Sequence, residues 1–348
     1  MSSTYFKNLK TQTDTRFWIN NPTLEDLTLA REQGAGNCTT NPAYCSKLIQ
    51  TDKAYLHTVI DEVLAEEPDI EAAASEVYRR TSKRVMDGLI DIYQSGKGVE
   101  GFVTIQDDPR KDTDAKHTMQ AVEINRKLGE NYMAKIPVIP GGIEAIEKCI
   151  EVNIPVCATE VFSISQADHI CEVYKKASER SGNSPPMYVT HISGIFDEYL
   201  GKVAEREKID IAPEILRLAG ISVARKQYLR MHDRKDKVTL LGGGARENYH
   251  FTGIAGGDAH ITINWSTAVD IMNSDATVEN TINQEIPRKV IDELRDKFPD
   301  YRKAYDDDGL TVEGFTHFGP VQLFRNAFLK GWYLLLAEVV SRKHARAL

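Results

Sequence analysis

Lys135 is the residue of this sequence whose surroundings point most clearly to chemistry. It stands in the run Tyr-Met-Ala-Lys-Ile-Pro-Val, residues 132–138, an apolar strand-like segment in which Pro137 interrupts the hydrogen-bonded ladder. An ammonium group placed there loses water, and because desolvation disfavours the charged form, burial lowers the pKa of the lysine. A neutral amine is a nucleophile toward carbonyl groups. The alternative is a lysine at a strand end whose ammonium reaches solvent.

A second candidate follows a run of three glycines at 242–244. Arg246 can supply a guanidinium group, and the glycine turn can supply backbone N–H groups, so together they can bind an oxyanion. The alternative is a tight turn with a surface arginine. His250 and His260 flank Asp258, but ten residues separate these histidines across a glycine-rich turn, which is not a metal-ligand spacing. The sequence therefore predicts an anion site and no metal site.

Eight short β-branched or aromatic runs, most of them followed by amphipathic stretches, are the elements that must position these residues. They lie at 17–20, 37–40, 101–106, 132–136, 155–162, 187–192, 238–242 and 259–263. Strands separated by helices pair in parallel through right-handed crossovers, and eight of them can close into a (β/α)₈ barrel. An open doubly wound sheet is the alternative, but no Gly-x-Gly-x-x-Gly follows the first run.

The pattern becomes helical after about residue 285, with helices predicted at 288–298 and 321–340. Aromatic and aliphatic residues recur at helical spacing in the second of these helices, namely Phe324, Phe328, Trp332 and Leu336. Such a stripe predicts a core-facing surface rather than a ligand site. We therefore predict an α/β fold in which 1–284 form a (β/α)₈ TIM barrel. Residues 285–348 are expected to form a helical C-terminal extension packed on the barrel within the same domain.

The active site of such a barrel lies at the C-terminal ends of its strands. The polar residues delivered there are Asn20, Thr39, Thr40, Asn41, Gln106, Lys135, Thr159, His191, Ser193 and Arg246. Alternation along a strand places Asn20 on the face of Trp18, and Lys135 on the face of Met133. Thr159 shares a face with Cys157 in the same way. Amide, amine and hydroxyl groups are thus expected to converge in one barrel lumen.

Four segments in this order resemble the motifs of the transaldolase family. They are Cys-Thr-Thr-Asn-Pro-Ala at 38–43, Lys-Ile-Pro at 135–137, Ala-Thr-Glu-Val-Phe-Ser at 158–163 with Gln-Ala at 166–167, and the glycine-rich segment from 243–246 to 255–258. The resemblance extends from about residue 16 to about residue 275. Thr-Thr-Asn-Pro alone is a weak signal, whereas four segments at barrel spacing are specific.

The resemblance implies a cofactor-independent class I enzyme in which Lys135 forms an imine with a ketose. Cleavage of a carbon–carbon bond then leaves a dihydroxyacetone enamine, which a second aldehyde captures. By the same resemblance, Thr39 and Asn41 hold hydroxyl groups of the donor, and Thr159 helps to hold a catalytic water. Arg246 is implied to bind the phosphate group of the sugar.

The chain departs from the family pattern at three positions. The family has an acid–base Asp where this chain has Asn20, a Glu where it has Gln106, and a second phosphate-binding Arg where it has Gly194. An amide keeps the hydrogen bonds of a carboxylate but cannot act as the base. Related fructose phosphate aldolases carry Gln at the position of Gln106. His191 lies near the missing arginine and is expected, with Ser193, among the substrate-binding residues; a core or surface histidine is the alternative.

We therefore expect transaldolase-like transfer of a dihydroxyacetone unit from a ketose phosphate to an aldose phosphate, as in the pentose phosphate pathway of carbohydrate metabolism. In this reading Lys135, Asn20, Gln106 and Thr159 are the catalytic group. One alternative is an aldolase that releases dihydroxyacetone from a sugar phosphate or another acidic sugar. The other is a member of the family that binds sugar phosphates with little turnover.

The composition is consistent with a protein that binds a small polar substrate. The 348 residues include 43 Lys and Arg against 51 Asp and Glu, a net charge of −8, and the basic residues are scattered rather than gathered in a stripe. This excludes a dedicated nucleic-acid binder. The chain has no apolar run long enough for a signal peptide or membrane span, and its five cysteines form no CxxC pair. We expect a cytoplasmic protein with reduced thiols, no cofactor and no metal. The sequence is compatible with a monomer and with a homo-oligomer.

Overall fold

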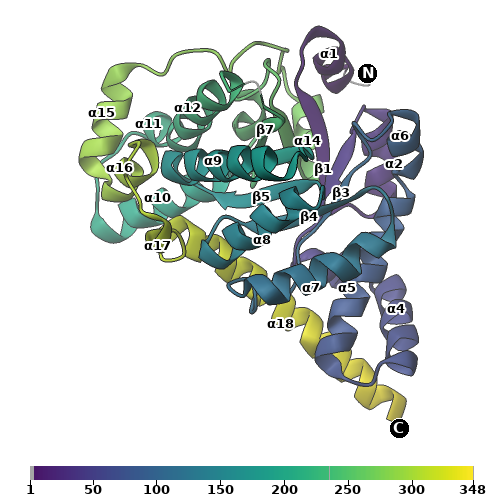
Figure 1. Cartoon of the computed structure of the whole chain (residues 1–348). Coiled ribbons are helices and arrows are strands. Elements are labelled where there is room, and N and C mark those ends of the chain that lie inside the picture. The colour runs from purple at the N-terminus through teal and green to yellow at the C-terminus, as the bar shows by residue number, and fades with distance from the viewer. Residues whose placement is uncertain (1–3, 235, 348) are drawn as a thin grey trace.

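The computed structural model describes residues 4–234 and 236–347 and contains a closed barrel of eight parallel strands (Figure 1). Neighbours in sequence pair all the way round, and the eighth strand pairs with the first. The strands are β1 (Arg16–Asn20), β2 (Asn37–Thr39), β3 (Val103–Ile105), β4 (Tyr132–Pro137), β5 (Val156–Val161), β6 (Met187–His191), β7 (Val238–Gly242) and β8 (His260–Ile263). Every predicted run overlaps one of them, and only β1 and β4 extend a residue beyond the predicted bounds, so the predicted (β/α)₈ fold is confirmed.

Helices surround the barrel. The chain begins with α1 (Tyr5–Gln12), and the connecting helices are α2 (Leu24–Glu32), α3 (Tyr44–Thr51), α4 (Lys53–Glu66), α5 (Ile70–Asp87), α6 (Ile90–Ser95), α7 (Ala115–Asn125) with the 3-10 turn η1 (Arg126–Leu128), α8 (Pro140–Glu151), α9 (Ile164–Ser181), α10 (Ser193–Glu207), α11 (Pro213–Leu216), α12 (Ala219–His232), α13 (Tyr249–Thr252) and α14 (Trp265–Asn273). The C-terminal part adds α15 (Arg288–Lys297), α16 (Pro299–Tyr305), α17 (Val312–Phe315) and α18 (Gly319–Ala347).

A capping box fixes the first connection after the barrel's first strand. Thr23 Oγ1 accepts a hydrogen bond from the Asp26 N–H at 3.1 Å, and the Asp26 carboxylate accepts one from the Thr23 N–H at 3.0 Å. These bonds satisfy amides that the first turn of a helix leaves unpaired, which is typically worth about 1 kcal/mol. They also fix the direction in which the chain leaves Asn20.

The lower part of the barrel lumen is filled by apolar and aromatic side chains. This interior cluster consists of Trp18, Phe102, Met133, Cys157, Tyr188 and Leu241. Because side chains alternate along a strand, the residues two positions after Trp18, Met133 and Cys157 point into the same lumen one layer higher. A packed floor therefore lies beneath the polar residues at the mouth of the barrel.

The long helix α18 runs across one end of the barrel, from α10 to the pair formed by α4 and α5 (Figure 1). It also packs on α3 and contacts β5. The predicted apolar stripe divides along this helix. Trp332 is fully buried in the core between α18 and the outer helices, as predicted, whereas Phe324 and Phe328 lie nearer the barrel mouth.

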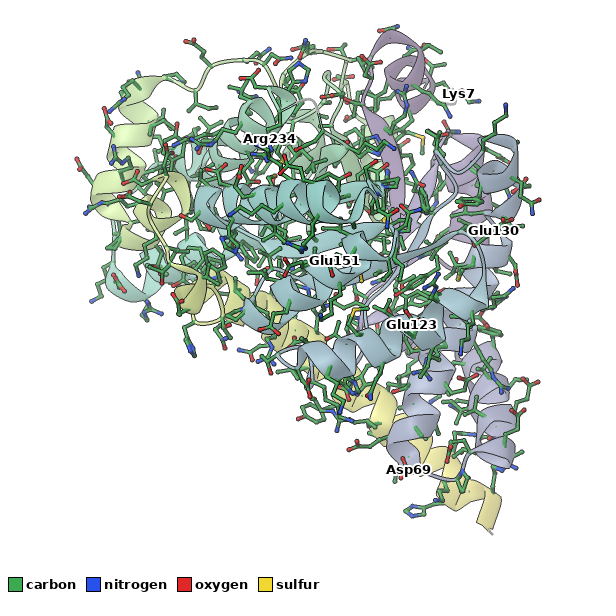
Figure 2. All side chains as sticks on the ribbon, viewed as in Figure 1. Lys7, Asp69, Glu123, Glu130, Glu151 and Arg234 are labelled. Atoms are coloured by element: carbon green, nitrogen blue, oxygen red, sulfur yellow. The ribbon has the colours of Figure 1, made fainter. Side chains whose placement is uncertain are left out.

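Charged side chains are distributed over the outside of the molecule. Figure 2 shows Lys7, Asp69, Glu123 and Glu130 on its periphery, where all four are exposed. All five cysteines are buried and unpaired, as the sequence predicts. Within the described residues, no helix has the length and apolar character needed to cross a membrane.

Candidate active site

A cavity of about 210 Å³ lies at the C-terminal mouth of the barrel, above the packed lumen. Strand ends and the following loops contribute Asn20, Asn21, Thr39, Asn41, Ala43, Lys135, Thr159, Thr190, Ile192, Gly243, Gly244, Ala245, Arg246, Thr262, Ile263 and Asn264 to its lining. Helix α18 contributes Phe324, Ala327 and Phe328, so it covers part of the opening. The structure thus gathers six of the predicted site residues, namely Asn20, Thr39, Asn41, Lys135, Thr159 and Arg246, in one cavity.

Lys135 is almost fully buried in this cavity. Its Nζ donates a hydrogen bond to the Thr40 carbonyl oxygen at 3.2 Å and lies 5.6 Å from the centroid of the Phe328 ring. Burial lowers the pKa of the Lys135 ammonium below its usual range, although the Cys157, Glu160 and Cys38 side chains oppose this effect. The site therefore favours a larger fraction of neutral amine than a lysine in water has.

Asn20 is held in a network of short polar side chains. Thr39 Oγ1 donates to Asn20 Oδ1 at 2.9 Å, and Asn20 Nδ2 donates to Asn264 Oδ1 at 2.9 Å. Thr39 Oγ1 also lies 2.7 Å from Thr262 Oγ1. These side chains come from β1, β2, β8 and the loop after β8. The network is rigid and uncharged, and it offers hydroxyl and amide groups to a polyhydroxylated ligand.

The loop after β2 is shaped by its own side chains. Asn41 Oδ1 accepts a hydrogen bond from the Ala43 N–H at 3.0 Å, which forms an Asx turn. Thr40 Oγ1 donates to the Thr104 carbonyl oxygen at 2.7 Å. These bonds fix the Thr40 carbonyl that accepts from Lys135, and they use only the oxygen of the Asn41 side chain, so its amide nitrogen can donate to a ligand.

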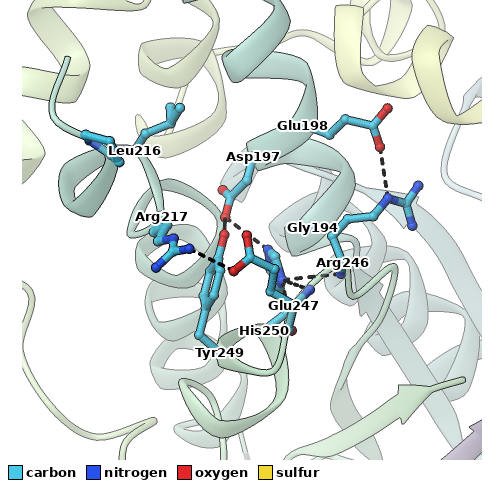
Figure 3. A pocket seen from close by; sticks show the side chains of 10 residues that line it. Gly194, Asp197, Glu198, Leu216, Arg217, Arg246, Glu247, Tyr249 and His250 are labelled. Atoms are coloured by element: carbon cyan, nitrogen blue, oxygen red, sulfur yellow. Dashed lines mark hydrogen bonds and ion pairs between the residues drawn. The ribbon is translucent and has the colours of Figure 1, made fainter. Parts of the chain in front are cut away.

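Arg246 lines both this cavity and a larger, more open depression of about 550 Å³, which is formed by α10, α11 and the segment from Arg246 to His250. Figure 3 shows its guanidinium directed toward Glu198, whose carboxylate accepts from Arg246 Nε at 2.9 Å. The Arg246 side chain keeps 47% of its surface exposed. An anion in the cavity must therefore compete with Glu198 for this arginine.

The loop that carries Arg246 is hydrogen-bonded to the buried side chain of His250 (Figure 3). His250 Nδ1 accepts from the backbone N–H groups of Arg246 and Glu247 at 3.3 and 3.1 Å, so its Nε2 donates to Asp197 at 3.1 Å. Tyr249 donates to the same Asp197 oxygen at 2.8 Å. Burial raises the pKa of Asp197, opposed by these hydrogen bonds.

The glycines of this region allow close backbone approach. Gly244 has φ +67°, and a Cβ on it would lie 2.4 Å from Ile192 Cγ2. A Cβ on Gly194 would lie 2.3 Å from the Gly244 carbonyl oxygen and 2.9 Å from Arg246 N. The position at which the family pattern has a second arginine therefore has no room for a side chain, because the Arg246 loop packs against it.

The structure does not bring His191 and Ser193 into the cavity. His191 is completely buried, and its Nε2 donates to the Gly220 carbonyl oxygen at 3.0 Å. Burial lowers its pKa to about 3, so it is neutral at ordinary pH and cannot pair with an anion as expected from the sequence. Its neighbour Thr190 lines the cavity instead, because side chains alternate along β6. Ser193 is the first residue of α10 and is likewise buried.

Gln106 lies just behind the cavity. Its Nε2 donates to Glu160 Oε1 at 3.2 Å, and both side chains are buried. The sequence reasoning did not single out Glu160, the partner of Gln106, or Thr262 and Asn264, which line the cavity. The available signal for Glu160 was a carboxylate within an otherwise apolar strand. Nothing in the sequence marks Thr262 and Asn264, since their role follows from the closure of β8 onto β1.

The chemistry available at this site is that of a desolvated amine surrounded by hydroxyl and amide groups, with an arginine at the rim. Within the described part of the chain, no group of three His, Cys, Asp or Glu side chains could hold a metal ion. His250 and His260 lie in different surroundings: His250 binds Asp197, whereas His260 Nδ1 accepts from Trp18 Nε1 at 2.8 Å.

Comparison with known proteins gives the same assignment at the level of the family. Residues 17–316 match the family described as Transaldolase/Fructose-6-phosphate aldolase. A transaldolase of Thiobacillus denitrificans is 22% identical over 326 residues, which cover 87% of this chain and 88% of that protein. Transaldolases of Renibacterium salmoninarum and Mycobacterium tuberculosis are 27% and 25% identical over segments that cover 61% and 55% of this chain. Those segments span 60% and 53% of the two relatives. The chain belongs to the transaldolase/fructose-6-phosphate aldolase family.

Proposed function

We propose that this protein transfers a dihydroxyacetone unit from a ketose phosphate to an aldose phosphate through an imine on Lys135. The observation that carries the proposal is the position of Lys135: a buried amine with a lowered pKa, inside a small cavity whose lining is rich in hydroxyl and amide groups. An amine in this setting is suited to attack a ketone.

The proposed reaction begins when the neutral Lys135 amine adds to the ketose carbonyl. Loss of water gives an iminium ion that can accept electrons from the neighbouring carbon–carbon bond. Deprotonation of the hydroxyl at the fourth carbon breaks the bond between the third and fourth carbons, which releases an aldose and leaves a three-carbon enamine. The enamine then attacks an acceptor aldehyde, and hydrolysis of the new iminium returns Lys135.

Three of the lining residues are suited to orient the donor. Thr39 and Asn41 lie at the end of β2 beside Lys135, where a hydroxyl and an amide can bind the hydroxyl groups of the sugar. Arg246 lies at the rim, where its fork of N–H groups can bind a phosphate. Lys135 and Arg246 thus give one cavity both an amine for a ketone and a guanidinium for a phosphate.

A second candidate function is aldol cleavage that releases dihydroxyacetone without transfer. The observation that favours it is the uncharged character of two predicted catalytic positions: Asn20, which lines the cavity, and Gln106, which does not, are amides where the transaldolase pattern has carboxylates. In this case the enamine is protonated instead of being captured by an aldehyde. The two functions differ in whether turnover requires an acceptor.

The test measures turnover of fructose 6-phosphate with and without erythrose 4-phosphate, in the wild type and in Lys135→Met. We expect acceptor-dependent turnover in the wild type and a loss of at least about 10³-fold in the variant, because methionine has a similar volume but forms no imine. Substantial turnover by folded Lys135→Met would overturn the proposal. Turnover that needs no acceptor would select the aldolase.

A further inference from the structure

Glu160 adopts a backbone conformation that reverses the direction of its side chain. It has φ +60° in β5, and the pairing of β5 with β6 shifts register between Ala158 and Val161. A β-bulge of this kind re-aims a side chain, and a non-glycine residue in the left-handed region costs about 1 kcal/mol or more. The Gln166 side chain stabilises the bulge by donating to the Glu160 carbonyl oxygen at 3.0 Å. The chain therefore maintains a strained conformation that places a carboxyl group at the barrel mouth.

The Glu160 carboxyl group lies among polar atoms that other residues do not satisfy. Its Oε1 accepts from Gln106 Nε2, whereas Glu160 Oε2, Gln106 Oε1 and Thr159 Oγ1 are buried and have no hydrogen-bond partner among the described residues. Thr159 lines the cavity that contains Lys135. Since buried polar atoms are normally hydrogen-bonded, these three atoms are available to bind water.

Three charged groups from different elements face Glu160. Asp112, in the loop before α7, raises the pKa of Glu160, whereas Lys135 on β4 and Arg325 on α18 lower it. Arg325 is itself paired with Asp112 at 2.7 Å, which connects α18 to that loop. Burial is the largest effect, and the pKa of Glu160 is raised to about 8. The group is thus mainly a neutral acid at pH 7.

We infer that Glu160 is the proton-relay residue of this site, which exchanges a proton with the reacting centre at Lys135 through water bound by Gln106 and Thr159. The inference rests on the proposed imine chemistry. It supplies the chain with an acid–base carboxyl group that Asn20 and Gln106 cannot provide. Because Glu160 does not line the cavity, it acts by positioning and exchanging protons rather than by touching the sugar.

The step assigned to Glu160 is the dehydration of the carbinolamine on Lys135. The carboxylic acid gives its proton, through water, to the departing hydroxyl group. The carbon–oxygen bond breaks, the nitrogen lone pair forms the carbon–nitrogen double bond, and the products are water, an iminium ion and the Glu160 carboxylate. When the product iminium is hydrolysed, the same carboxylate takes a proton back from the attacking water. The proton that Glu160 gives during dehydration is therefore returned to it during hydrolysis.

The first test compares the pH dependence of kcat/KM in the wild type and in Glu160→Gln. The wild-type rate is expected to fall with rising pH through a limb near pH 8, since only protonated Glu160 can donate. Glu160→Gln keeps the shape and the hydrogen-bonding capacity of the side chain, and we expect it to lose that limb together with about 10²-fold in kcat. A merely structural glutamate would leave the shape of the profile unchanged.

A second variant keeps the inference testable if Glu160→Gln does not fold. Asp112→Asn removes the anion that raises the pKa of Glu160, so the descending limb should move to lower pH, by about one unit. A wild-type profile without a descending limb, or a limb that neither variant alters, would overturn the role of Glu160.

Borohydride trapping with the same ketose separates this failure from a failure of the proposed function. If the wild type gives a reduced adduct on Lys135 while the pH profiles contradict the relay, the imine chemistry stands and Glu160 is structural. If the wild type gives no adduct, the proposed function itself fails.

Discussion

Lys135 and His191 are both buried basic residues near the barrel mouth, and burial lowers the pKa of each. Their surroundings nevertheless suit them to different roles. Lys135 faces a cavity and has one hydrogen bond to a carbonyl oxygen, so its amine can reach a ligand. His191 is directed toward the Gly220 carbonyl oxygen and is not part of the lining of the Lys135 cavity. The first is suited to chemistry, and the second contributes to packing.

Arg246 gives a prediction at the residue scale. If its guanidinium fork binds the substrate phosphate, Arg246→Lys should raise KM for a phosphorylated ketose about tenfold, because lysine keeps the charge but loses the bidentate geometry. The KM for unphosphorylated dihydroxyacetone should change much less. Steady-state kinetics with both substrates makes the comparison.

Glu198→Gln is the matched variant, since the Glu198 carboxylate accepts a hydrogen bond from Arg246 Nε. Removing the Glu198 charge should lower KM for the phosphorylated ketose a few-fold, because the phosphate then no longer competes with a carboxylate for Arg246. Equal changes in KM for the phosphorylated and unphosphorylated substrates would mean that Arg246 supports the loop without contacting phosphate.

At the scale of the element, we expect helix α18 to limit how much water reaches the amine, because it lines the cavity that contains Lys135. Phe328 belongs to this helix and lines the cavity; it is only 2% exposed, and its ring centroid is 5.6 Å from Lys135 Nζ. Phe328→Ala should admit water, raise the pKa of Lys135 and move the ascending limb of the pH–rate profile to higher pH by about one unit. The limb rises with pH because only the neutral amine attacks the ketone.

Tyr333→Ala is the control on the same helix, because the Tyr333 side chain is 56% exposed. It should leave the ascending limb in place. If Phe328→Ala and Tyr333→Ala give the same profile as the wild type, α18 does not control the hydration of Lys135. Thermal unfolding of both variants separates this effect from loss of stability, which for Phe328→Ala can reach about 3 kcal/mol.

The elements of the barrel could be predicted from the sequence because their signals are local. The strand runs alternate with amphipathic stretches, and residues such as Met133 and Lys135 share a face by simple alternation. The inward residue of β6 could not be assigned, since Thr190 and His191 are both polar and adjacent. The path of α18 over the barrel mouth depends on contacts between residues far apart in the sequence. The bulge at Glu160 reverses the alternation that the prediction uses.

At the scale of the whole molecule, buried histidines make the stability of the barrel sensitive to acid. His191 has a pKa of about 3 in the folded protein and an ordinary value of 6.5 when unfolded, so below pH 6.5 the unfolded chain binds a proton that the folded chain excludes. Its contribution to stability is complete above pH 6.5 and decreases as the pH falls. Between pH 7 and pH 5 we expect a loss of about 2 kcal/mol from this group.

His191→Asn removes the titrating group and keeps a side-chain donor for the Gly220 carbonyl oxygen. Urea unfolding of wild type and variant at pH 7 and pH 5 measures the effect. The variant should lose less free energy of unfolding than the wild type over this interval, whatever its stability at pH 7. An equal loss in both proteins would show that His191 is not the titrating group.

The central claim is that the Lys135 amine forms an imine with a ketose, and borohydride reduction tests it most directly. The wild-type protein is incubated with fructose 6-phosphate, reduced, digested and examined by mass spectrometry. The result we expect is a stable three-carbon or six-carbon adduct on the peptide that contains Lys135, absent without sugar and absent in Lys135→Met. Active protein that gives no adduct, or an adduct on another lysine, would contradict the claim.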